Sequence, residues 1–422
     1  MNENYIPVLL LTGYLGSGKT TLLNRILTNR RGIRFAVIVN DIGEVNIDAE
    51  LIQKGGVVAQ QDDNLVALQN GCICCSLKMD LVQQLHDLCA ATDAGNQYPE
   101  ANGSVVESKP AFDYIIIEAS GICEPAPIAQ TICSYTSLIA SSPNSPSPKL
   151  DAIVTVVDAL RMRDEFVEQL SPMTNSQLPI AKAEDLSSLV IEQIEFCNLI
   201  LLNKVSEVSE EEREHIRAIL RAIQPKAKII DCDYCDVSFG EILDTELFDF
   251  EQVATSATWI QMVEEDIKED HHHEHHHHDE HEHDHHHECD DPHCHCHNHG
   301  DEYGITTFVY YRRKPFDLNR FDEFVARHWD KGIIRCKGMC YFEEEYDMCY
   351  LFEQAGKQFN LKQAGSFYAT MPEEELMQLM ARDPMLQRDW DEQYGDRMQK
   401  LVFIGQNINR EAITKALDNC LV

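Results

Sequence analysis

The feature that most constrains this chain is an octapeptide near its beginning, G-Y-L-G-S-G-K-T at residues 13–20. It matches G-x-x-x-x-G-K-[S/T], the P-loop, in which backbone N–H groups curl around the phosphates of a nucleotide. The apolar run Val8–Leu11 precedes it, and Thr20–Leu27 follows with helix-like apolar spacing. A strand before the loop and a helix after it are the context in which this motif binds phosphate. The sequence therefore predicts a P-loop nucleoside triphosphatase.

The side chains of the P-loop have separate predicted roles. Lys19 is expected to reach the terminal phosphates as a point charge, and the Thr20 hydroxyl is expected to bind Mg²⁺. The glycines let the backbone approach the phosphates closely. The residues predicted to bind the nucleotide in this loop are Gly13, Gly16, Ser17, Gly18, Lys19, Thr20 and Thr21.

Apolar runs without alternation recur through the first part of the chain, separated by helix-like segments. This order is typical of a parallel sheet with helices on its faces, so an α/β fold is predicted. Two polar stretches, Thr92–Pro110 and Ser141–Lys149, are predicted to be surface loops. The expected strands are Val8–Leu11, Phe35–Val39, Tyr114–Ile117, Ile153–Val157 and Leu199–Leu202, and the expected helices are Thr20–Leu27 and Glu210–Ile223.

A second strand end carries an acid that suits nucleotide chemistry. The apolar run Tyr114–Ile117 leads into Glu118, and Gly121 follows three residues later. A carboxylate in this place can act on the magnesium side of the site or position the attacking water. The N–H group of Gly121 can donate to the γ-phosphate. Together with the P-loop, Glu118 and Gly121 are therefore predicted to belong to the catalytic site.

A third strand end bears on the choice of base. Leu199–Leu202 runs into Asn203 and Lys204, the start of the N-K-x-D motif with which GTPases read guanine. The fourth position holds Ser206, whose hydroxyl offers a weaker acceptor than a carboxylate does. Glu207 is an alternative acid. Asn203 and Lys204 are the predicted base-binding residues, and the guanine assignment rests on them.

Three thiols stand close together in the sequence N-G-C-I-C-C at residues 70–75. Strand-like spacing points Cys72 and Cys74 the same way, and a turn at Cys75 brings in the third thiol. Zinc accepts thiolate and carboxylate ligands in tetrahedral geometry, so two or three of these cysteines plus an acid form a plausible zinc site. The alternative is that they are inert buried cysteines.

Residues 264–302 form a low-complexity segment that holds 16 of the 19 histidines, among many carboxylates. It lacks the apolar side chains needed for a core, so we expect it to be disordered and to separate two domains. Imidazoles and thiols at flexible spacing bind zinc, nickel and copper with little geometric choice. Metal capture is the functional interpretation, and a solvated acidic linker is the alternative. The densest cluster contains His293, Cys294, His295 and Cys296.

The last part of the chain predicts a small α+β domain resembling the ferredoxin-like fold. Cys336, Cys340 and Cys349 fall on two of its expected strands, where packing in the core is favoured over a second metal site. The expected elements are strands at Gly304–Arg312, Ile333–Phe342, Asp347–Phe352 and Lys400–Ile404, and helices at Leu318–His328 and Arg410–Leu421. The predicted domains are residues 1–260, a metal-binding linker at 261–302, and residues 303–422.

Charge and cysteine content restrict the partners. The 422 residues include 35 basic and 71 acidic side chains, a formal net charge of −36, which argues against nucleic acid and anionic membranes. The sequence has no apolar run of the length needed to span a bilayer. Its 16 cysteines, several of them adjacent, are typical of thiols in a reducing compartment. We therefore expect a cytoplasmic protein, and a homo-oligomer is compatible with the sequence.

These motifs together resemble the CobW-type metallochaperone GTPases. The resemblance rests on the P-loop, N-D-I-G-E-V-N-I-D at 40–48, G-C-I-C-C at 71–75, E-A-S-G at 118–121 and L-L-N-K at 201–204. Segments 335–338 and 401–405 resemble the C-terminal domain of the same family. The resemblance implies a zinc site made by Cys72, Cys74, Cys75 and Glu44. It also places Asp41 and Glu44 on a switch segment near magnesium, and thus adds Asp41 to the catalytic set.

The family couples GTP binding and hydrolysis to metal insertion, which for most members means zinc. The resemblance therefore implies a GTPase that uses Mg²⁺ and delivers zinc to a metal-dependent client protein. Two alternatives stay open. One is a metal store or sensor in which the nucleotide only sets the conformation. The other is a GTPase that matures a cobalt or nickel cofactor.

Overall fold

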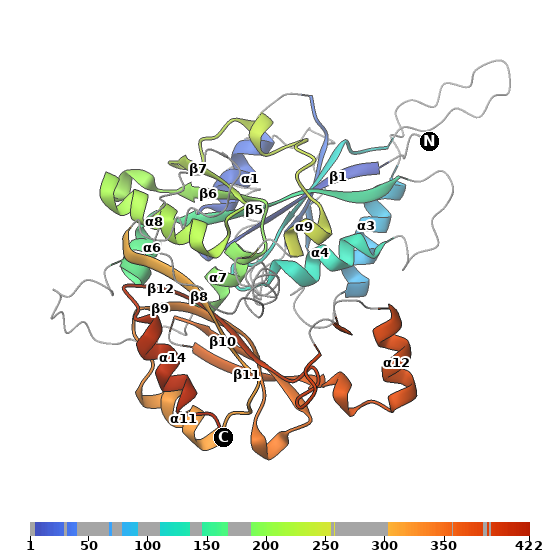
Figure 1. The fold of residues 1–422 in the computed structure, drawn as a ribbon. Helices are drawn as coiled ribbons and strands as arrows, with labels where there is room; N and C mark the ends of the chain where they lie inside the picture. The colour runs from blue at the N-terminus through green and yellow to red at the C-terminus, as the bar shows by residue number, and fades with distance from the viewer. Residues whose placement is uncertain are drawn as a thin grey trace, which may run out of the picture. The chain divides into compact units, whose positions relative to one another are not determined.

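The computed structural model divides into two compact units, each built around its own β-sheet (Figure 1). In the residues that it describes, no helix is long and apolar enough to cross a membrane. The described residues are 5–28, 32–39, 67–69, 78–91, 110–135, 146–167, 187–254, 257, 303–356, 358–382, 386–387 and 390–422.

The first unit contains a seven-stranded sheet in the order β3-β2-β4-β1-β5-β6-β7, and every neighbouring pair in it is parallel. Its strands are β1 (Tyr5–Gly13), β2 (Phe35–Val39), β3 (Ala67–Gln69), β4 (Tyr114–Glu118), β5 (Ser147–Asp158), β6 (Leu199–Asn203) and β7 (Lys228–Cys232). Because all strands run the same way, their carboxyl ends meet at one edge of the sheet.

Helices account for the burial of both faces of this sheet. Leu9 and Leu11 of β1 pack with Leu22, Leu23 and Ile26 of helix α1 (Lys19–Thr28) in one core cluster. The alternate residues of β1, which point to the opposite face, are fully buried as well. Helix α4 (Pro125–Cys133) contacts β1 and β5, and α3 (Lys78–Ala90) packs against α4. This arrangement explains why the strands read as continuous apolar runs.

The remaining described helical segments of this unit lie after β5. They are the short α6 (Ala159–Met162), the π-helical turn η2 (Arg163–Val167), α7 (Ser187–Glu195), the 3-10 turn η4 (Val205–Glu207), α8 (Glu210–Ile223), the 3-10 turn η5 (Phe239–Glu241) and α9 (Phe250–Ala254). Helix α8 has a reciprocal cap. Ser209 N–H donates to Glu212 Oε2 at 2.7 Å, and Glu212 N–H donates to Ser209 Oγ at 3.2 Å.

The second unit is an α+β domain with a five-stranded antiparallel sheet in the order β11-β10-β9-β12-β8. Phe321 of helix α11 lies 4.9 Å from Phe316 and 5.2 Å from Phe352, ring centroid to centroid, in an aromatic core shared with α14. The elements are β8 (Ile305–Arg312), α11 (Leu318–Arg327), β9 (Ile333–Cys340), η8 (Glu343–Glu345), β10 (Met348–Ala355), β11 (Gln358–Ser366), η9 (Tyr368–Thr370), α12 (Glu373–Arg382), β12 (Gln399–Gln406) and α14 (Arg410–Asp418).

The sequence prediction of two folds, a parallel α/β sheet and an α+β domain, is confirmed. The predicted loop at Ser141–Lys149 is wrong in part, because Ser147–Lys149 pairs with β1 as the start of β5. Thr92–Pro110 lies outside the described residues up to 109. Strand β11 and helix α12 were not predicted. The proposed domain limits at 260 and 302 stay a prediction, since 258–302 lies outside the described residues.

Two smaller expectations concern the C-terminal unit. The packing of Cys336, Cys340 and Cys349 is confirmed, because all three are buried on β9 and β10. Burial raises the pKa of the Cys349 thiol to about 11.

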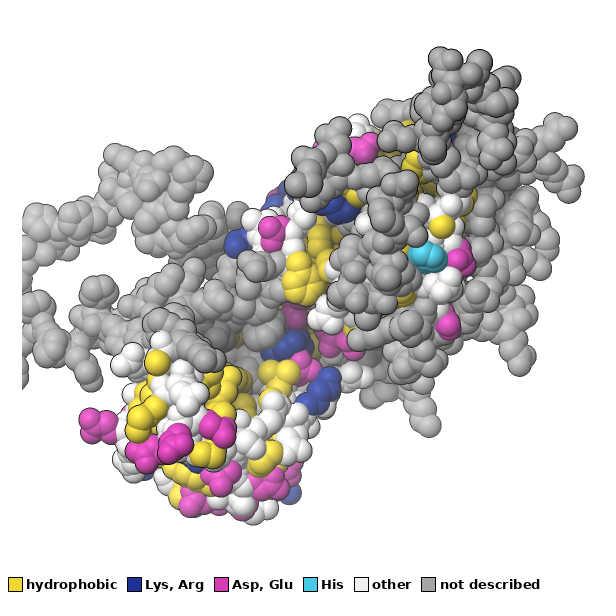
Figure 2. All heavy atoms as spheres, turned by 90° about the vertical axis from the view of Figure 1, so that its right-hand side faces the viewer, with side chains coloured by type: hydrophobic (Ala, Val, Ile, Leu, Met, Phe, Trp, Pro, Cys, Tyr) yellow, Lys and Arg dark blue, Asp and Glu magenta, His cyan; other side chains and the backbone are white. Residues whose placement is uncertain are grey.

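Figure 2 shows acidic side chains gathered on the C-terminal unit, and the first turn of α12 is acidic at Glu373–Glu375. This surface agrees with the large negative net charge.

Candidate nucleotide site

The P-loop connects β1 to α1, and its glycines are required by backbone geometry. Gly13, Gly16 and Gly18 have φ values of 136°, 78° and 119°, a region that side chains disfavour. A Cβ atom on Gly13 would lie 2.3 Å from the Val156 carbonyl oxygen. A Cβ atom on Gly18 would lie 2.5 Å from Asn203 Nδ2. The loop is thus packed against the ends of β5 and β6, with its N–H groups at the start of a helix.

The two predicted phosphate and magnesium residues follow directly. Lys19 Nζ donates to the Tyr14 carbonyl oxygen at 3.2 Å, so its side chain lies over the loop. Thr20 Oγ1 donates to Glu118 Oε1 at 3.0 Å. Glu118 is 3% exposed and ends β4, opposite Leu11 of β1. The structure therefore brings together the hydroxyl and the carboxylate that the sequence assigned to the magnesium side.

The turn after β4 contacts the P-loop. A Cβ atom on Gly121 would come within 2.7 Å of the Leu15 backbone nitrogen, so only a glycine allows this approach. Gln193 of α7 holds the turn, since its Nε2 donates to the carbonyl oxygens of Gly121 at 3.3 Å and Cys123 at 3.2 Å. Gly121 consequently lies next to the P-loop, and its contact with a γ-phosphate stays a prediction. Gln193 is a supporting residue that the sequence did not indicate.

Asn203 ties the base-reading segment to the P-loop. It is 3% exposed, and its Nδ2 donates to the Ser17 carbonyl oxygen at 2.8 Å. Its Oδ1 accepts from the backbone N–H of Cys235 at 3.0 Å. The Asn203 side chain thus holds the P-loop and the loop after β7 next to each other.

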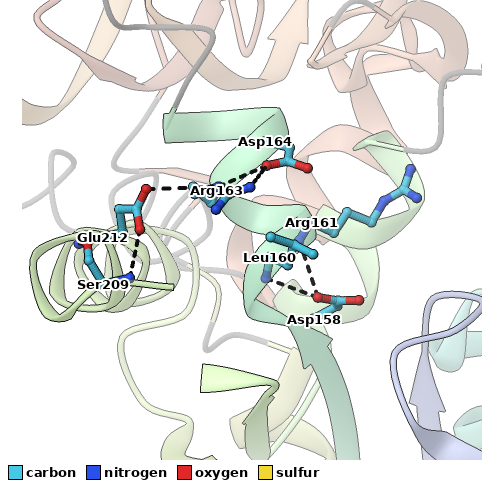
Figure 3. A network of polar contacts seen from close by, with 7 residues as sticks. All are labelled: Asp158, Leu160, Arg161, Arg163, Asp164, Ser209 and Glu212. Atoms are coloured by element: carbon cyan, nitrogen blue, oxygen red, sulfur yellow. Dashed lines mark hydrogen bonds and ion pairs between the residues drawn. The ribbon is translucent and has the colours of Figure 1, made fainter. Parts of the chain in front are cut away.

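Lys204 follows in the left-handed region, with φ of 64°. Its ammonium forms an ion pair with the carboxylate of Asp158, the last residue of β5. Asp158 also caps α6, and Figure 3 shows its Oδ1 accepting from the backbone nitrogens of Leu160 at 3.0 Å and Arg161 at 3.2 Å. The same figure shows Glu212 held by Ser209 at the start of α8. Sequence reasoning missed Asp158, although its place at a strand end was a usable signal.

The fourth position of the base-reading motif contacts an acid from another strand. Ser206 donates to Asp233 Oδ1 through its backbone N–H at 3.0 Å and through its hydroxyl at 2.8 Å. Glu207, the acid suggested from the sequence, is exposed on η4. The sequence did not point to Asp233.

Two buried thiols lie beside this loop. Cys235 Sγ donates to the Gly18 carbonyl oxygen at 3.3 Å, and Cys232 Sγ lies 3.7 Å from Asn203 Oδ1. A hydrogen bond from Cys232, aided by the charges of Arg25 and Lys204, lowers the pKa of Cys235. The same hydrogen bond together with burial raises the pKa of Cys232. These thiols therefore connect the loop after β7 to the P-loop.

The proposed zinc ligands lie outside the described residues, and so does Asp41. They are Glu44, Cys72, Cys74, Cys75, His293, Cys294, His295 and Cys296. Within the described part of the chain, no group of three or more His, Cys, Asp or Glu side chains could hold a metal ion.

The described strands still fix where two of these segments begin. Val39 ends β2 and Gln69 ends β3, and the two residues are register partners. Val39 is also the partner of Glu118 on β4. The last residues of β2 and β3, which precede these two segments in the chain, therefore lie side by side and next to Glu118.

Comparison with known proteins agrees with this geometry. Residues 7–231 match the family model described as "CobW/HypB/UreG, nucleotide-binding domain". Residues 305–421 match the model of the "Cobalamin synthesis protein cobW C-terminal domain". The chain belongs to the CobW family. The resemblance drawn from its motifs is thereby confirmed over both folded units.

Three CobW-related proteins illustrate the relationship. "Zinc-regulated GTPase metalloprotein activator 1" of Dictyostelium discoideum is 32% identical over 430 residues, covering 99% of this chain and 80% of that protein. "Zinc chaperone YjiA" of Escherichia coli is 32% identical over 253 residues, covering 60% of this chain and 65% of that one. "Zinc chaperone CobW" of Pseudomonas aeruginosa is 28% identical over 234 residues, or 54% and 56% of the two chains.

Proposed function

We propose that this protein is a GTP-hydrolysing metallochaperone that binds zinc and delivers it to a client protein. The observation that carries the proposal is the pairing of Val39 with both Gln69 and Glu118. This pairing supports the proposal because the residues that precede the switch segment and the cysteine motif lie beside Glu118, the carboxylate that contacts Thr20. A nucleotide-dependent change at one segment can then reach metal ligands on the other without a long pathway.

The nucleotide would be held by residues whose geometry fits phosphate and magnesium. The glycine-lined loop and the first turn of α1 present N–H groups to the phosphates, and Lys19 supplies positive charge. Thr20 and Glu118 would hold Mg²⁺, and Asp41 on the switch segment would join them. Gly121 would donate its N–H to the γ-phosphate. Bound Mg²⁺ supplies charge neutralisation between the phosphates, which favours departure of the terminal phosphoryl group.

Zinc is the proposed cargo, held by Cys72, Cys74 and Cys75 with Glu44 as the fourth ligand. Thiolates and one carboxylate suit tetrahedral zinc. Glu44 belongs to the switch segment, so a nucleotide that orders this segment changes the number of ligands on the metal. The histidine-rich segment at 264–302, with His293, Cys294, His295 and Cys296, would capture zinc when it is scarce. The protein is proposed to act in the cytoplasm.

The test is a zinc titration of the full chain with and without a non-hydrolysable GTP analogue. Linkage requires that the analogue change zinc affinity by the same factor by which zinc changes analogue affinity. The double substitution Cys74→Ser and Cys75→Ser should abolish tight zinc binding and leave analogue binding intact. Cys133→Ser, an exposed thiol on α4, is the matched control. Identical zinc affinity in both nucleotide states would remove the coupling, and absence of zinc-dependent GTP turnover would favour a metal store.

A further inference from the structure

The loop after β7 places a carboxylate where the base-reading motif lacks one. The motif N-K-x-D requires an acid at its fourth position, and this chain has Ser206 there. Asp233 Oδ1 accepts both the N–H and the hydroxyl of Ser206, at 3.0 Å and 2.8 Å. Asp233 and Ser206 are 27 residues apart in the chain, so tertiary structure alone brings them together.

The position of Asp233 follows from the sheet register. Strands β6 and β7 are parallel neighbours, and Asn203 pairs with Cys232 at their carboxyl ends. Asp233 is therefore one residue beyond the partner of Asn203, at the edge that carries the base-reading residues. The turn that follows is fixed by left-handed residues at Tyr234 and Cys235, with φ of 52° and 55°. Cys235 N–H then binds Asn203 Oδ1 at 3.0 Å.

The carboxylate is held in one orientation and keeps an oxygen for a ligand. Ser206 donates only to Oδ1, and Oδ2 of Asp233 has no hydrogen-bonding partner among the described residues. Guanine presents two donors on its Watson–Crick edge, N1–H and the 2-amino group. Adenine presents the N1 lone pair instead, which a carboxylate repels. An oriented carboxylate at this edge thus distinguishes the two bases by charge and hydrogen bonding.

Glu207 does not have this support. It is exposed on η4, and the described residues make no hydrogen bond or ion pair with its carboxylate. Ordering its long side chain on a base would cost conformational entropy that Asp233, already held by two donors, does not lose. We propose that Asp233, presented by Ser206, is the residue that selects guanine in this protein. The inference rests on the proposed nucleotide-binding function and names the determinant of its base specificity.

The test measures binding of GTP, ATP and xanthosine triphosphate by competition with a fluorescent GTP analogue on the full chain. In Asp233→Asn, the two Ser206 donors hold the amide oxygen, so the amide NH₂ points toward the base. An NH₂ group repels the guanine amino group and donates to the 2-oxo group of xanthine. GTP affinity should fall about 10- to 100-fold, and affinity for xanthosine triphosphate should rise by a similar factor.

Two further variants test whether the base preference depends on a carboxylate at Asp233 and not on the neighbouring acid Glu207. Glu207→Gln removes the neighbouring acid and should leave all three affinities unchanged. The exchange of Ser206→Asp with Asp233→Ser puts the acid back on the motif position and should restore the preference for GTP that Asp233→Ser alone loses. The affinity ratio within one variant is independent of the fraction of folded protein, so partial misfolding does not imitate a switch.

The outcomes separate this inference from the function on which it rests. If Asp233→Asn keeps the wild-type ratio of GTP to xanthosine triphosphate affinity, the inference is wrong while the GTPase proposal stands. A switch in Glu207→Gln would instead assign the role to Glu207. If the wild-type chain binds GTP and ATP with equal affinity, the inference is also wrong, because the protein then has no preference for guanine that Asp233 could explain. If the wild-type chain binds none of the three nucleotides, the nucleotide proposal fails as well.

Discussion

The two sheets of this molecule place their charged residues in opposite ways. In the parallel sheet, the polar residues Glu118, Asp158 and Asn203 are each the last residue of a strand, and the three strands are otherwise mostly apolar, with Lys149, Asp151 and Thr155 inside β5 as the exceptions. In the antiparallel sheet, charge lies in mid-strand, where Lys337 of β9 and Glu353 of β10 are register partners. Their Nζ and Oε1 atoms are 2.8 Å apart.

The difference follows from strand direction. Parallel strands end at one edge, so the polar side chains that end β4, β5 and β6 lie at the same edge of the sheet, where one ligand could meet all of them. Neighbouring antiparallel strands end at opposite edges, so their terminal residues do not gather in this way. A buried charge in that sheet must find a cross-strand partner, which here is Lys337 with Glu353. We therefore expect changes at the first set to alter nucleotide chemistry and changes in the second unit to alter stability.

The largest expected effect tests whether nucleotide chemistry takes place at the carboxyl edge of the parallel sheet. Lys19→Ala removes the positive charge at the P-loop and should lower GTP turnover about 10³-fold, since preorganised charge in a phosphate site stabilises the transition state. Lys415→Ala, an exposed lysine on α14, is the control and should have wild-type turnover. Steady-state GTP hydrolysis with excess Mg²⁺ measures both variants. Wild-type turnover in Lys19→Ala would show that the P-loop is not the catalytic site.

The second-largest expected effect tests whether changes in the C-terminal unit alter stability and leave nucleotide binding intact. Phe321→Ala leaves a cavity among the stacked rings of the C-terminal unit and should lower the free energy of unfolding by about 3 kcal/mol. Leu318→Ala, an exposed position on the same helix, should cost far less. Denaturant unfolding and GTP-analogue binding are measured on the same samples. A large loss of nucleotide affinity at conditions where Phe321→Ala is folded would break the proposed division of roles.

A third effect separates two functions of one strand-end residue. Asp158→Ala removes the cap of α6 and the ion pair with Lys204, so the free energy of unfolding should fall by about 1 to 2 kcal/mol. Asp158→Asn can still cap the helix and should lose only the ion pair. Both variants should weaken GTP binding, because Lys204 is no longer held. If only the Ala variant loses affinity, the cap and not the ion pair positions Lys204.

The sequence identified elements whose signals are local. Strand β2 and helix α8 were predicted with the limits that the structure shows, and in the structure α8 starts at a capping box of Ser209 and Glu212. Strand β11 was missed because all nine of its residues are exposed and only Phe359 and Leu361 give its sequence a short apolar alternation. The wrong loop at Ser147–Lys149 has a similar cause. Serine and proline indicate a turn, whereas pairing with Tyr5–Pro7 makes this segment a strand.

The residues of the candidate site also fall into two groups: those that a local sequence signal identifies and those that only the fold brings to the site. The P-loop, Glu118 and Asn203 stand in recognisable motifs or at strand ends, so sequence alone could select them. Asp233 has no such motif, and its contact with Ser206 depends on β7 lying beside β6. Gln193 likewise reaches the turn after β4 from a helix about 70 residues further along the chain. Sequence motifs therefore could not identify residues such as these, which reach the site from elements that are distant in the chain.

The smallest expected effect concerns the pH dependence of the cross-strand pair. Burial by itself would raise the pKa of Glu353. The hydrogen bond and charge of Lys337, with the charges of Arg335 and Lys362, outweigh burial and lower it below its usual value of 4.5. A lowered folded-state pKa contributes stability that is fully present above that usual value and is lost as the pH falls through the folded-state pKa. Opposite-charge pairs across neighbouring strands contribute roughly 0.2–1 kcal/mol, so the effect should be small.

Glu353→Gln should therefore flatten the acid limb of the stability curve of the full chain. The variant also leaves Lys337 without its carboxylate and is expected to be less stable at every pH, so the slope between pH 5 and 3 is the informative quantity. Denaturant unfolding at several pH values measures it, with Glu323→Gln on the exposed face of α11 as the control for loss of a carboxylate. An acid slope equal to that of the wild type would show that the pair in the antiparallel sheet is electrostatically neutral to folding. The contrast between the two sheets would then rest on the position of their charges alone, and not on what those charges contribute.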